Sequence, residues 1–188
     1  EIKPAQEASS VTFNHANTTQ TLQASLTVVA DGGRSLGEIE GIKKETKEYG
    51  HDALVTKVRA ELPHHHVAYE RLTPTGPMAL LPNGDTSFSL VWTGLQANID
   101  RLLALDDKTF LAQLHQAFGD RVGKFLSVEK RMSFPLKLST LKPSVAPHLA
   151  VIGNAAQTMH PVAGQGFNVG MRDAWTLADL IINASIIR

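Results

Sequence analysis

The sequence predicts an α+β fold whose largest element is a mostly antiparallel β-sheet. In the middle of the chain, several short segments alternate apolar and polar residues, which is the pattern of half-buried strands. On either side of this region, a short strand-like segment ends in a glycine-containing turn, once at Asp31 and once at Gly153. One clear helix pattern follows the strands, and a second lies near the end of the chain.

The N-terminal segment predicts a β-hairpin over Val11–Asp31. The stretches VTFNH and TLQASLTVVAD alternate around ANTTQ, as the strands of a hairpin do. The second strand is expected to end in the turn ADGGRS, and the charged residues Gly37–Glu48 predict a surface loop or a short helix. Alternate residues of that strand share one face: Leu22, Ala24, Leu26, Val28 and Ala30.

Further strands are predicted at ALVTKVRA, HVAYERLT, PMALLP and TSFSLVWTG. The Asn83–Gly84 pair within PNGD is a strong hairpin signal, because both residues tolerate positive φ. Phe88 and Trp92 share a face and are expected in the core of the sheet rather than in the wall of a substrate site.

A helix is predicted between Asp106 or Asp107, either of which can cap its start, and Gly119, which ends it. Its apolar residues form one stripe: Phe110, Leu111, Leu114, Ala117 and Phe118.

The C-terminal part predicts a strand at VEKRMSFPL, a short apolar strand at HLAVIG and a helix over FNVGMRDAWTLADLIINA. Two distant strands that end in similar turns suggest one nucleotide-binding domain with a sheet domain inserted into it. The predicted boundaries are residues 1–40 and 146–188 for the first domain and 41–145 for the second.

Composition excludes several classes of function. Lys+Arg and Asp+Glu balance at 18 each, so no net charge favours nucleic acid. The absence of cysteine excludes disulfides, thiolate catalysis and zinc–thiolate sites, and is compatible with the cytoplasm. The N-terminus has no secretory signal, and the apolar stretch Leu177–Ile187 is too short and too polar to span a bilayer.

The loop GQGFNVG, which starts at Gly164, is the main candidate for a ligand site. Its third glycine, Gly170, is one position late for the dinucleotide fingerprint, and the strand LAVIG ends too early, so a pyrophosphate cradle is rejected. Two interpretations remain. The glycines let the backbone and the N-terminus of the next helix approach a planar or anionic group, or they form only a tight turn into a packed helix.

The stretch VIGNAAQTMHPVAGQGFNVGMRDAWTLADLI closely resembles the second FAD motif of the aromatic hydroxylase flavoproteins, the family that includes para-hydroxybenzoate hydroxylase. That motif reads roughly Gly-Asp-Ala-Ala-His, a Pro, Gly-Gln-Gly-x-Asn and an Asp-Ala. ADGGRS is similar to the Asp-Gly turn of the family. GNAAQ, YERLTPTGPMALLP and SLVWT are most similar to the ubiquinone-biosynthesis hydroxylases, and among them to the octaprenyl-methoxyphenol hydroxylase group. The resemblance covers nearly the whole chain.

The resemblance implies part of an α/β FAD-binding domain with an inserted substrate-binding sheet. It also implies an FAD-dependent monooxygenase that hydroxylates a prenylated phenol, using NAD(P)H and O₂ through a flavin hydroperoxide. Because such a substrate lives in the membrane, a cytoplasmic protein with peripheral contact at the inner membrane is expected. No catalytic residue and no metal is implied. The implied cofactor-binding residues are Asp31, Gly32, Gly153, Asn154, Pro161, Gly164, Gln165, Gly166, Phe167 and Asn168.

The chain departs from the family in three places. Asn154 stands where the motif usually has Asp, and Glu38 where the Asp-Gly turn is often followed by Arg. The N-terminal Gly-x-Gly-x-x-Gly unit, which carries the ADP half of FAD in the family, is not found. The chain therefore looks like a fragment that is inactive alone and exposes strand edges, which favour self-association or contact with other ubiquinone-biosynthesis proteins. The alternative is a non-catalytic module that binds an apolar ligand or a partner without flavin.

Three other groups are open to more than one interpretation. His64, His65 and His66 are expected at a solvated strand edge rather than around a metal, because neighbouring strand residues point to opposite faces. By resemblance, His160 lies near the isoalloxazine ring, or else it is a helix-start histidine bonded to the backbone. Arg172 and Asp173 form a local pair or, more in keeping with their position, have a structural role.

Overall fold

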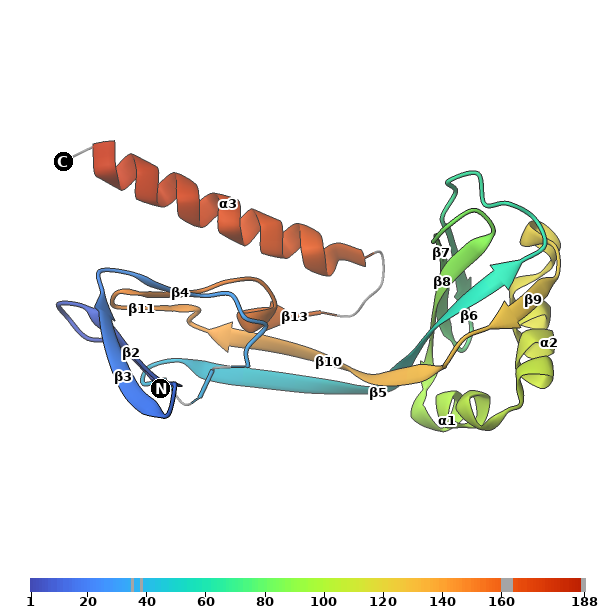
Figure 1. Cartoon of the computed structure of the whole chain (residues 1–188), viewed down its shortest axis with the longest axis horizontal. Coiled ribbons are helices and arrows are strands. Elements are labelled where there is room, and N and C mark those ends of the chain that lie inside the picture. The colour runs from blue at the N-terminus through green and yellow to red at the C-terminus, as the bar shows by residue number, and fades with distance from the viewer. Residues whose placement is uncertain (35, 38, 160–163, 187–188) are drawn as a thin grey trace. The chain divides into compact units, whose positions relative to one another are not determined.

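The computed structural model describes residues 1–34, 36–37, 39–159 and 164–186. The predicted α+β class is confirmed, since runs of mostly antiparallel strands are followed by the helices α1 (Gln96–Ala104), α2 (Asp107–Phe118) and α3 (Gln165–Ile186) rather than alternating with them one by one (Figure 1). The chain divides into two compact units, here called unit 1 (residues 1–48 and 137–188) and unit 2 (residues 49–136). The assignment of residues 41–145 to a substrate domain stays a prediction.

Unit 2 is built on an antiparallel sheet in the order β5-β8-β7-β6. Each neighbouring pair is antiparallel, and a further strand, β9, pairs with β5. The predicted hairpin at Asn83–Gly84 is confirmed, because β7 and β8 are joined there and Gly84 has φ +87°. The strands are β5 (Lys43–Ala60), β6 (Tyr69–Thr73), β7 (Gly76–Pro82), β8 (Ser87–Leu95) and β9 (Phe125–Val128).

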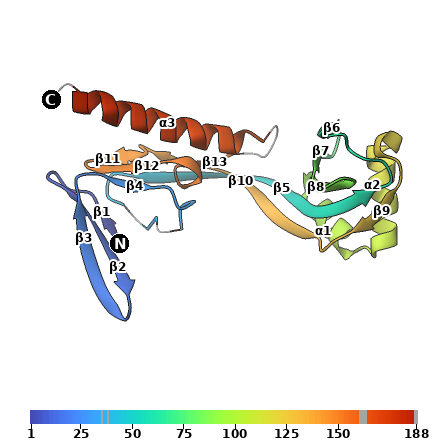
Figure 2. The same ribbon diagram turned by 45° about the horizontal axis from the view of Figure 1, so that its top comes forward.

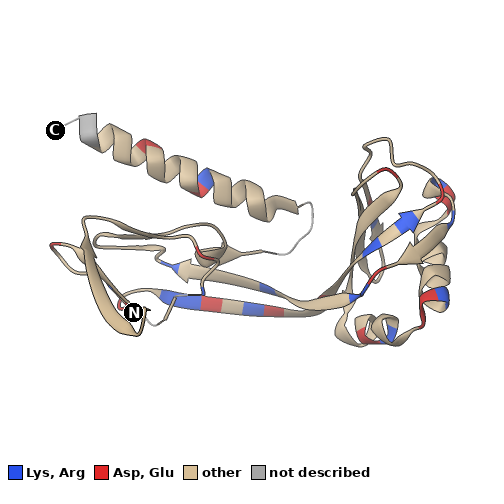
Figure 3. Cartoon of the chain, in the orientation of Figure 1, with Lys and Arg blue, Asp and Glu red and all other residues tan. Residues whose placement is uncertain are grey.

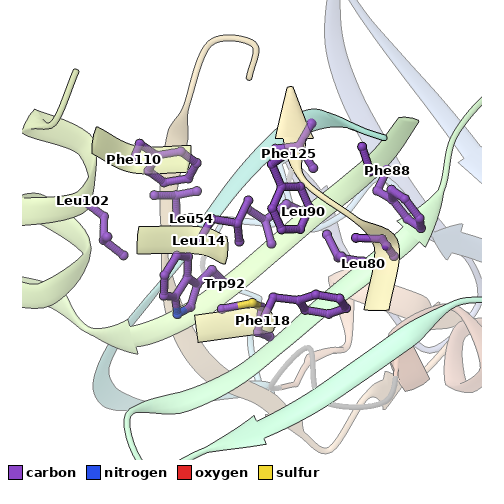
Figure 4. Packing of buried hydrophobic residues seen from close by; sticks show 14 of the residues in the cluster. Leu54, Leu80, Phe88, Leu90, Trp92, Leu102, Phe110, Leu114, Phe118 and Phe125 are labelled. Carbon is purple, nitrogen blue, oxygen red and sulfur yellow. The ribbon is translucent and has the colours of Figure 1, made fainter. Parts of the chain in front are cut away.

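The core of unit 2 lies between one face of this sheet and helices α1 and α2 (Figure 4). Phe88 is fully buried and Trp92 is 8% exposed, so their prediction as sheet core is confirmed. Alternation along β8 points these side chains toward the helices. Phe110 and Leu114 of α2 close the core from the other side.

Helix α2 has the predicted ends. The Asp106 carboxylate accepts a hydrogen bond from the backbone N–H of Thr109 at 3.0 Å, and Gly119 follows the last turn with φ +89°. Arg131 joins α2 to α1, because its guanidinium donates to Leu102 O at 3.1 Å and to the Asp107 carboxylate at 3.0 Å.

Helix α1 was not predicted. It starts after Leu95, whose side chain cannot cap a helix, and its first turn has no acidic residue. The usual start signals are therefore missing from the sequence. Ile99 and Leu102 are buried, which indicates that packing on the sheet holds this helix in place rather than local propensity.

Unit 1 begins with a small antiparallel sheet of β1 (Ile2–Lys3), β2 (Ser9–His15) and β3 (Thr18–Ala24). The predicted hairpin is confirmed for β2 and β3, which turn at Ala16 and Asn17 with φ +47° and +64°. The prediction that the second strand continues to Asp31 is wrong. β3 ends at Ala24, and a separate strand, β4 (Thr27–Val29), pairs with a different partner.

The prediction of a loop or short helix over Gly37–Glu48 holds for the described residues before Lys43, but it is wrong for residues 43–48, where β5 begins. Lys and Glu make up all of residues 43–48 of β5 except Thr46 (Figure 3). Two of its carboxylates are neutralised from β10 (Met132–Lys142): Lys137 is 2.7 Å from Glu48, and Lys142 is 2.8 Å from Glu45. These partners are about ninety residues away in sequence. The local sequence of the charged segment therefore predicts a loop, because it does not reveal the lysines that pair with it.

The remaining strands of unit 1 form the part that positions the candidate site. β12 (Leu149–Val151) lies between β11 (Val145–Ala146) and β4, antiparallel to the first and parallel to the second (Figure 2). A short β13 (Gln157–Thr158) pairs with β10. A second core forms here, with Val29, Leu149 and Val151 buried in it.

The histidine run does not lie on a strand edge, so that prediction is wrong. His64 is 5% exposed and caps a turn: its Nδ1 accepts from His66 N at 2.9 Å, and its Nε2 contacts Gly84 O. His65 and His66 adopt positive φ. Within the described residues, no three His, Cys, Asp or Glu side chains gather as metal ligands, and no helix is long and apolar enough to cross a membrane.

Candidate functional site

The two predicted turns lie side by side in unit 1. β4 and β12 run parallel with Val29 opposite Val151, and the backbone N–H of Ile152 donates to Val29 O at 3.0 Å. Parallel strands bring their carboxyl ends to the same edge of a sheet, which is where ligands bind in open α/β sheets. Asp31 and Gly153, each two residues beyond its strand, therefore occupy this edge together.

The Asp31 turn is closed by its own side chain. The Asp31 carboxylate accepts a hydrogen bond from the backbone N–H of Gly33 at 2.8 Å. Gly32 and Gly33 have φ +75° and +86°, which favours glycine at both positions. A β-carbon on Gly33 would lie 3.6 Å from the Cα of Ala155, whereas one on Gly32 would meet no atom of the described residues within 4 Å. The turn thus contacts the Gly153 turn through Gly33 and leaves Gly32 open.

The Gly153 turn is a short 3-10 helix, Gly153–Ala155, that contacts the N-terminal half of α3. Gly153 has φ +62°, and its backbone N–H donates to the Asp173 carboxylate at 3.0 Å. A β-carbon on Gly170 would lie 3.4 Å from the Cα of Gly153. The third glycine of the loop is therefore a packing residue, and the predicted structural role of Asp173 is confirmed.

The glycines at the start of α3 are not packed as Gly170 is. Gly164 has φ +60°, and α3 begins at Gln165. Among the described residues, no atom lies within 4 Å of where a β-carbon on Gly166 would stand, and the φ of Gly166 is not positive. Neither neighbouring atoms nor a left-handed backbone therefore requires glycine at position 166. The first backbone N–H groups of a helix have no partner within the helix itself.

The first turn of α3 carries no acidic side chain of its own. The partial positive charge of the helix end is therefore not neutralised within that turn. The Asn168 amide donates to Gln165 Oε1 at 3.2 Å, which braces the first turn. Phe167 is 76% exposed and Asn154 is exposed. Such a surface can accept an anionic or electron-rich planar group.

The structure thus brings Asp31, Gly32, Gly153 and Asn154 to one sheet edge, and packs α3 against that edge through Gly170 and Asp173. Pro161 lies outside the described residues, as do His160 and Glu38. Sequence reasoning missed the contact of Gly33 with Ala155. The repeated strand-to-glycine-turn pattern was the available signal, but the pairing of the two strands is a non-local property.

The residues present suit the flavin half of FAD. Among the described residues, no atom crowds the β-carbon positions of Gly32 and Gly166, so a ligand can approach the backbone there, and the positive helix end matches an electron-rich ring edge. The Asn154 amide can hydrogen-bond a hydroxyl, although without the charge that the usual Asp would add. The roles of the individual residues remain predictions.

Comparison with known proteins identifies the family. The chain matches the FAD binding domain family over residues 3–185 and belongs to it. It is 43% identical to the ubiquinone hydroxylase UbiL of Rhodospirillum rubrum, covering 88% of this chain and 39% of that protein. It is 33% identical to the 3-demethoxyubiquinol 3-hydroxylase of Escherichia coli, covering 88% and 42%.

Among solved structures, p-nitrophenol 4-monooxygenase from Pseudomonas putida matches with a TM-score of 0.72 at 15% identity, covering 98% of this chain and 47% of that one. This likeness supports the fold. The chain spans about two fifths of the length of the two curated relatives it matches.

Proposed function

We propose that this chain contributes the flavin-facing part of an FAD-dependent monooxygenase that hydroxylates a prenylated phenol in ubiquinone biosynthesis, with NAD(P)H and O₂ as co-substrates. The observation that carries the proposal is the sheet edge where the Asp31 and Gly153 turns meet beside an open helix start. Membership of the FAD binding domain family and the two ubiquinone-pathway relatives support it.

Each part of the site has a proposed task. When bound, FAD supplies the redox and oxygen-transfer chemistry. The N–H groups of Gly166 and Phe167, at the start of α3, would stabilise negative charge on the bound ring, and residues 164–166 would lie beside it. Asn154 hydrogen-bonds a hydroxyl of the ribityl chain. Asp31 and Gly32 supply a turn at which both FAD and NAD(P)H are held.

The sheet of unit 2 has a face that suits an apolar substrate. The helices pack on one face, and alternate residues project from the other. On that second face, Val55 lies opposite Val91, and Val91 lies opposite Ala79. These side chains are only partly buried within the protein. We propose that this apolar row contacts the prenylated phenol.

The choice among ubiquinone-pathway substrates is part of the proposal. The resemblance to the octaprenyl-methoxyphenol hydroxylase group favours a methoxyphenol, whereas one relative is a 3-demethoxyubiquinol 3-hydroxylase. We also propose partners, because α3 exposes the large apolar side chains of Phe167, Met171 and Trp175. Such a helix face favours self-association or contact with other ubiquinone-biosynthesis proteins.

The test is oxygen incorporation. The protein as its organism makes it is incubated with FAD, NADH or NADPH, isotopically labelled O₂ and a prenylated methoxyphenol, and the products are analysed by mass spectrometry. The proposal predicts one labelled oxygen atom in the ring and NAD(P)H oxidation that depends on FAD. Absence of flavin absorbance after FAD addition, together with no NAD(P)H oxidation, would refute it.

A further inference from the structure

A groove in unit 2 lies between one face of α2 and strand β9, away from the elements of the candidate flavin site. Its volume is about 620 Å³. Helix α2 lines it with residues one turn apart, and β9 lines it with a continuous run. The lining residues are Asp107, Lys108, Leu111, Ala112 and His115 on the helix side, and Lys124, Phe125, Leu126, Ser127 and Val128 on the strand side.

The floor and one wall of the groove are apolar. Phe125 is 8% exposed and belongs to the core of unit 2, and Leu111 packs against that core. Leu126 points outward, with 48% of its surface exposed. Leu126 thus extends the apolar floor to the surface of unit 2.

The lining of the groove carries two lysines and one carboxylate, and a further carboxylate, that of Asp120, lies 2.9 Å from Nε2 of the lining residue His115. Lys108 and Lys124 are exposed, and within the described residues neither ammonium group has a carboxylate within 4.0 Å. The one carboxylate in the lining, Asp107, is paired with Arg131 at 3.0 Å. The nearby Glu61 carboxylate accepts a hydrogen bond from the backbone N–H of Lys124 at 3.0 Å. An occupant therefore meets an apolar floor between two unpaired cations.

We propose that this α2–β9 groove is a docking surface for an anionic lipid bilayer. Unpaired lysines attract anionic headgroups, and an adjacent exposed leucine enters the boundary between headgroups and acyl chains. The inference rests on the proposed function in one respect, since a prenylated phenol must be taken from a membrane. It adds the surface through which the protein meets that membrane.

The test uses vesicle co-sedimentation of the protein as it is made by its organism. One set of vesicles contains phosphatidylglycerol and phosphatidylethanolamine, and a neutral set contains phosphatidylcholine alone. The groove variant is Lys108→Gln with Lys124→Gln, and a second variant is Leu126→Asp. The matched control is Lys44→Gln with Lys47→Gln on β5, which removes the same charge from exposed lysines of unit 1.

The proposal predicts that the protein binds anionic vesicles and that the groove double variant binds them about tenfold more weakly or worse, since each lysine near the surface contributes about one kcal/mol. The control keeps its binding to within about twofold, and Leu126→Asp also loses binding. Equal weakening in the groove and control variants, or equal binding to neutral vesicles, would overturn the proposal. Turnover of a short-chain, water-soluble phenol is measured in parallel, so that loss of hydroxylase activity is distinguished from loss of docking.

Discussion

Replacing Gly166 by alanine tests whether this glycine is needed for flavin binding or only for the turn into α3. In a helix, alanine is more favourable than glycine by about 0.5–1 kcal/mol, because it restricts the unfolded chain. The new methyl group at position 166 meets no atom of the described residues within 4 Å, so no packing cost from them opposes this gain. The free energy of unfolding of the flavin-free protein should therefore rise by about that amount.

Flavin binding should change in the opposite direction. The methyl group occupies the space beside the first N–H groups of α3. This is where we propose that the edge of the flavin ring lies. We expect the dissociation constant for FAD to rise about tenfold, which corresponds to about 1.4 kcal/mol. Urea unfolding of the flavin-free protein and a fluorescence titration with FAD measure the two effects separately.

The matched control is Gly170→Ala, one turn further along the same helix. A β-carbon there lies 3.4 Å from the Cα of Gly153, so crowding offsets the intrinsic gain and the stability should not rise. If Gly166→Ala raises stability and leaves the affinity for FAD unchanged, the glycine serves only the start of the helix and the reasoning is refuted.

Three further predictions concern stability. Asp173→Ala should lower the free energy of unfolding by about 1–2 kcal/mol, because the N–H of Gly153 loses its acceptor; calorimetry checks this, and an unchanged value would contradict it. Arg131→Met should lower the free energy of unfolding by about 2 kcal/mol, because it removes two hydrogen bonds and the contact of the guanidinium with the Phe110 ring at 4.8 Å. Lys130→Met should leave this free energy nearly unchanged when both variants are unfolded in urea. Hydrogen bonds from the Thr109 side chain and backbone lower the pKa of Asp106, so its cap stabilises above the ordinary aspartate pKa, and this contribution is lost as the pH falls through the lowered value. Asp106→Asn, which keeps a cap, should flatten this acid dependence in unfolding curves recorded at several pH values, and an unchanged slope would count against it.

Local signals in the sequence were sufficient for several elements. The cap at Asp106 and the stop at Gly119 define α2 because both act within one helical turn. The turn at Gly84 defines the β7–β8 hairpin for the same reason. The strand-to-turn repeats at Asp31 and Gly153 were also visible, and they led to the candidate site.

Non-local pairing accounts for what the sequence did not reveal. Thr27–Val29 reads as a continuation of β3, because only its partner, β12, distinguishes it. Lys43–Glu48 reads as a loop, because the lysines that neutralise it lie on β10. The sequence alone does not distinguish the roles of Gly166 and Gly170. The structure does, because Gly170 packs against Gly153 and Gly166 does not.

The central claim is that the Asp31 turn and the start of α3 contact the flavin. Its most direct test is NMR of the protein with selectively labelled glycine, recorded before and after FAD is added. We expect the amide signals of Gly32, Gly164 and Gly166 to shift, while those of Gly119 and Gly123, which follow α2 in unit 2, remain in place. Unchanged signals at Gly32 and Gly166 in a protein saturated with FAD would contradict it.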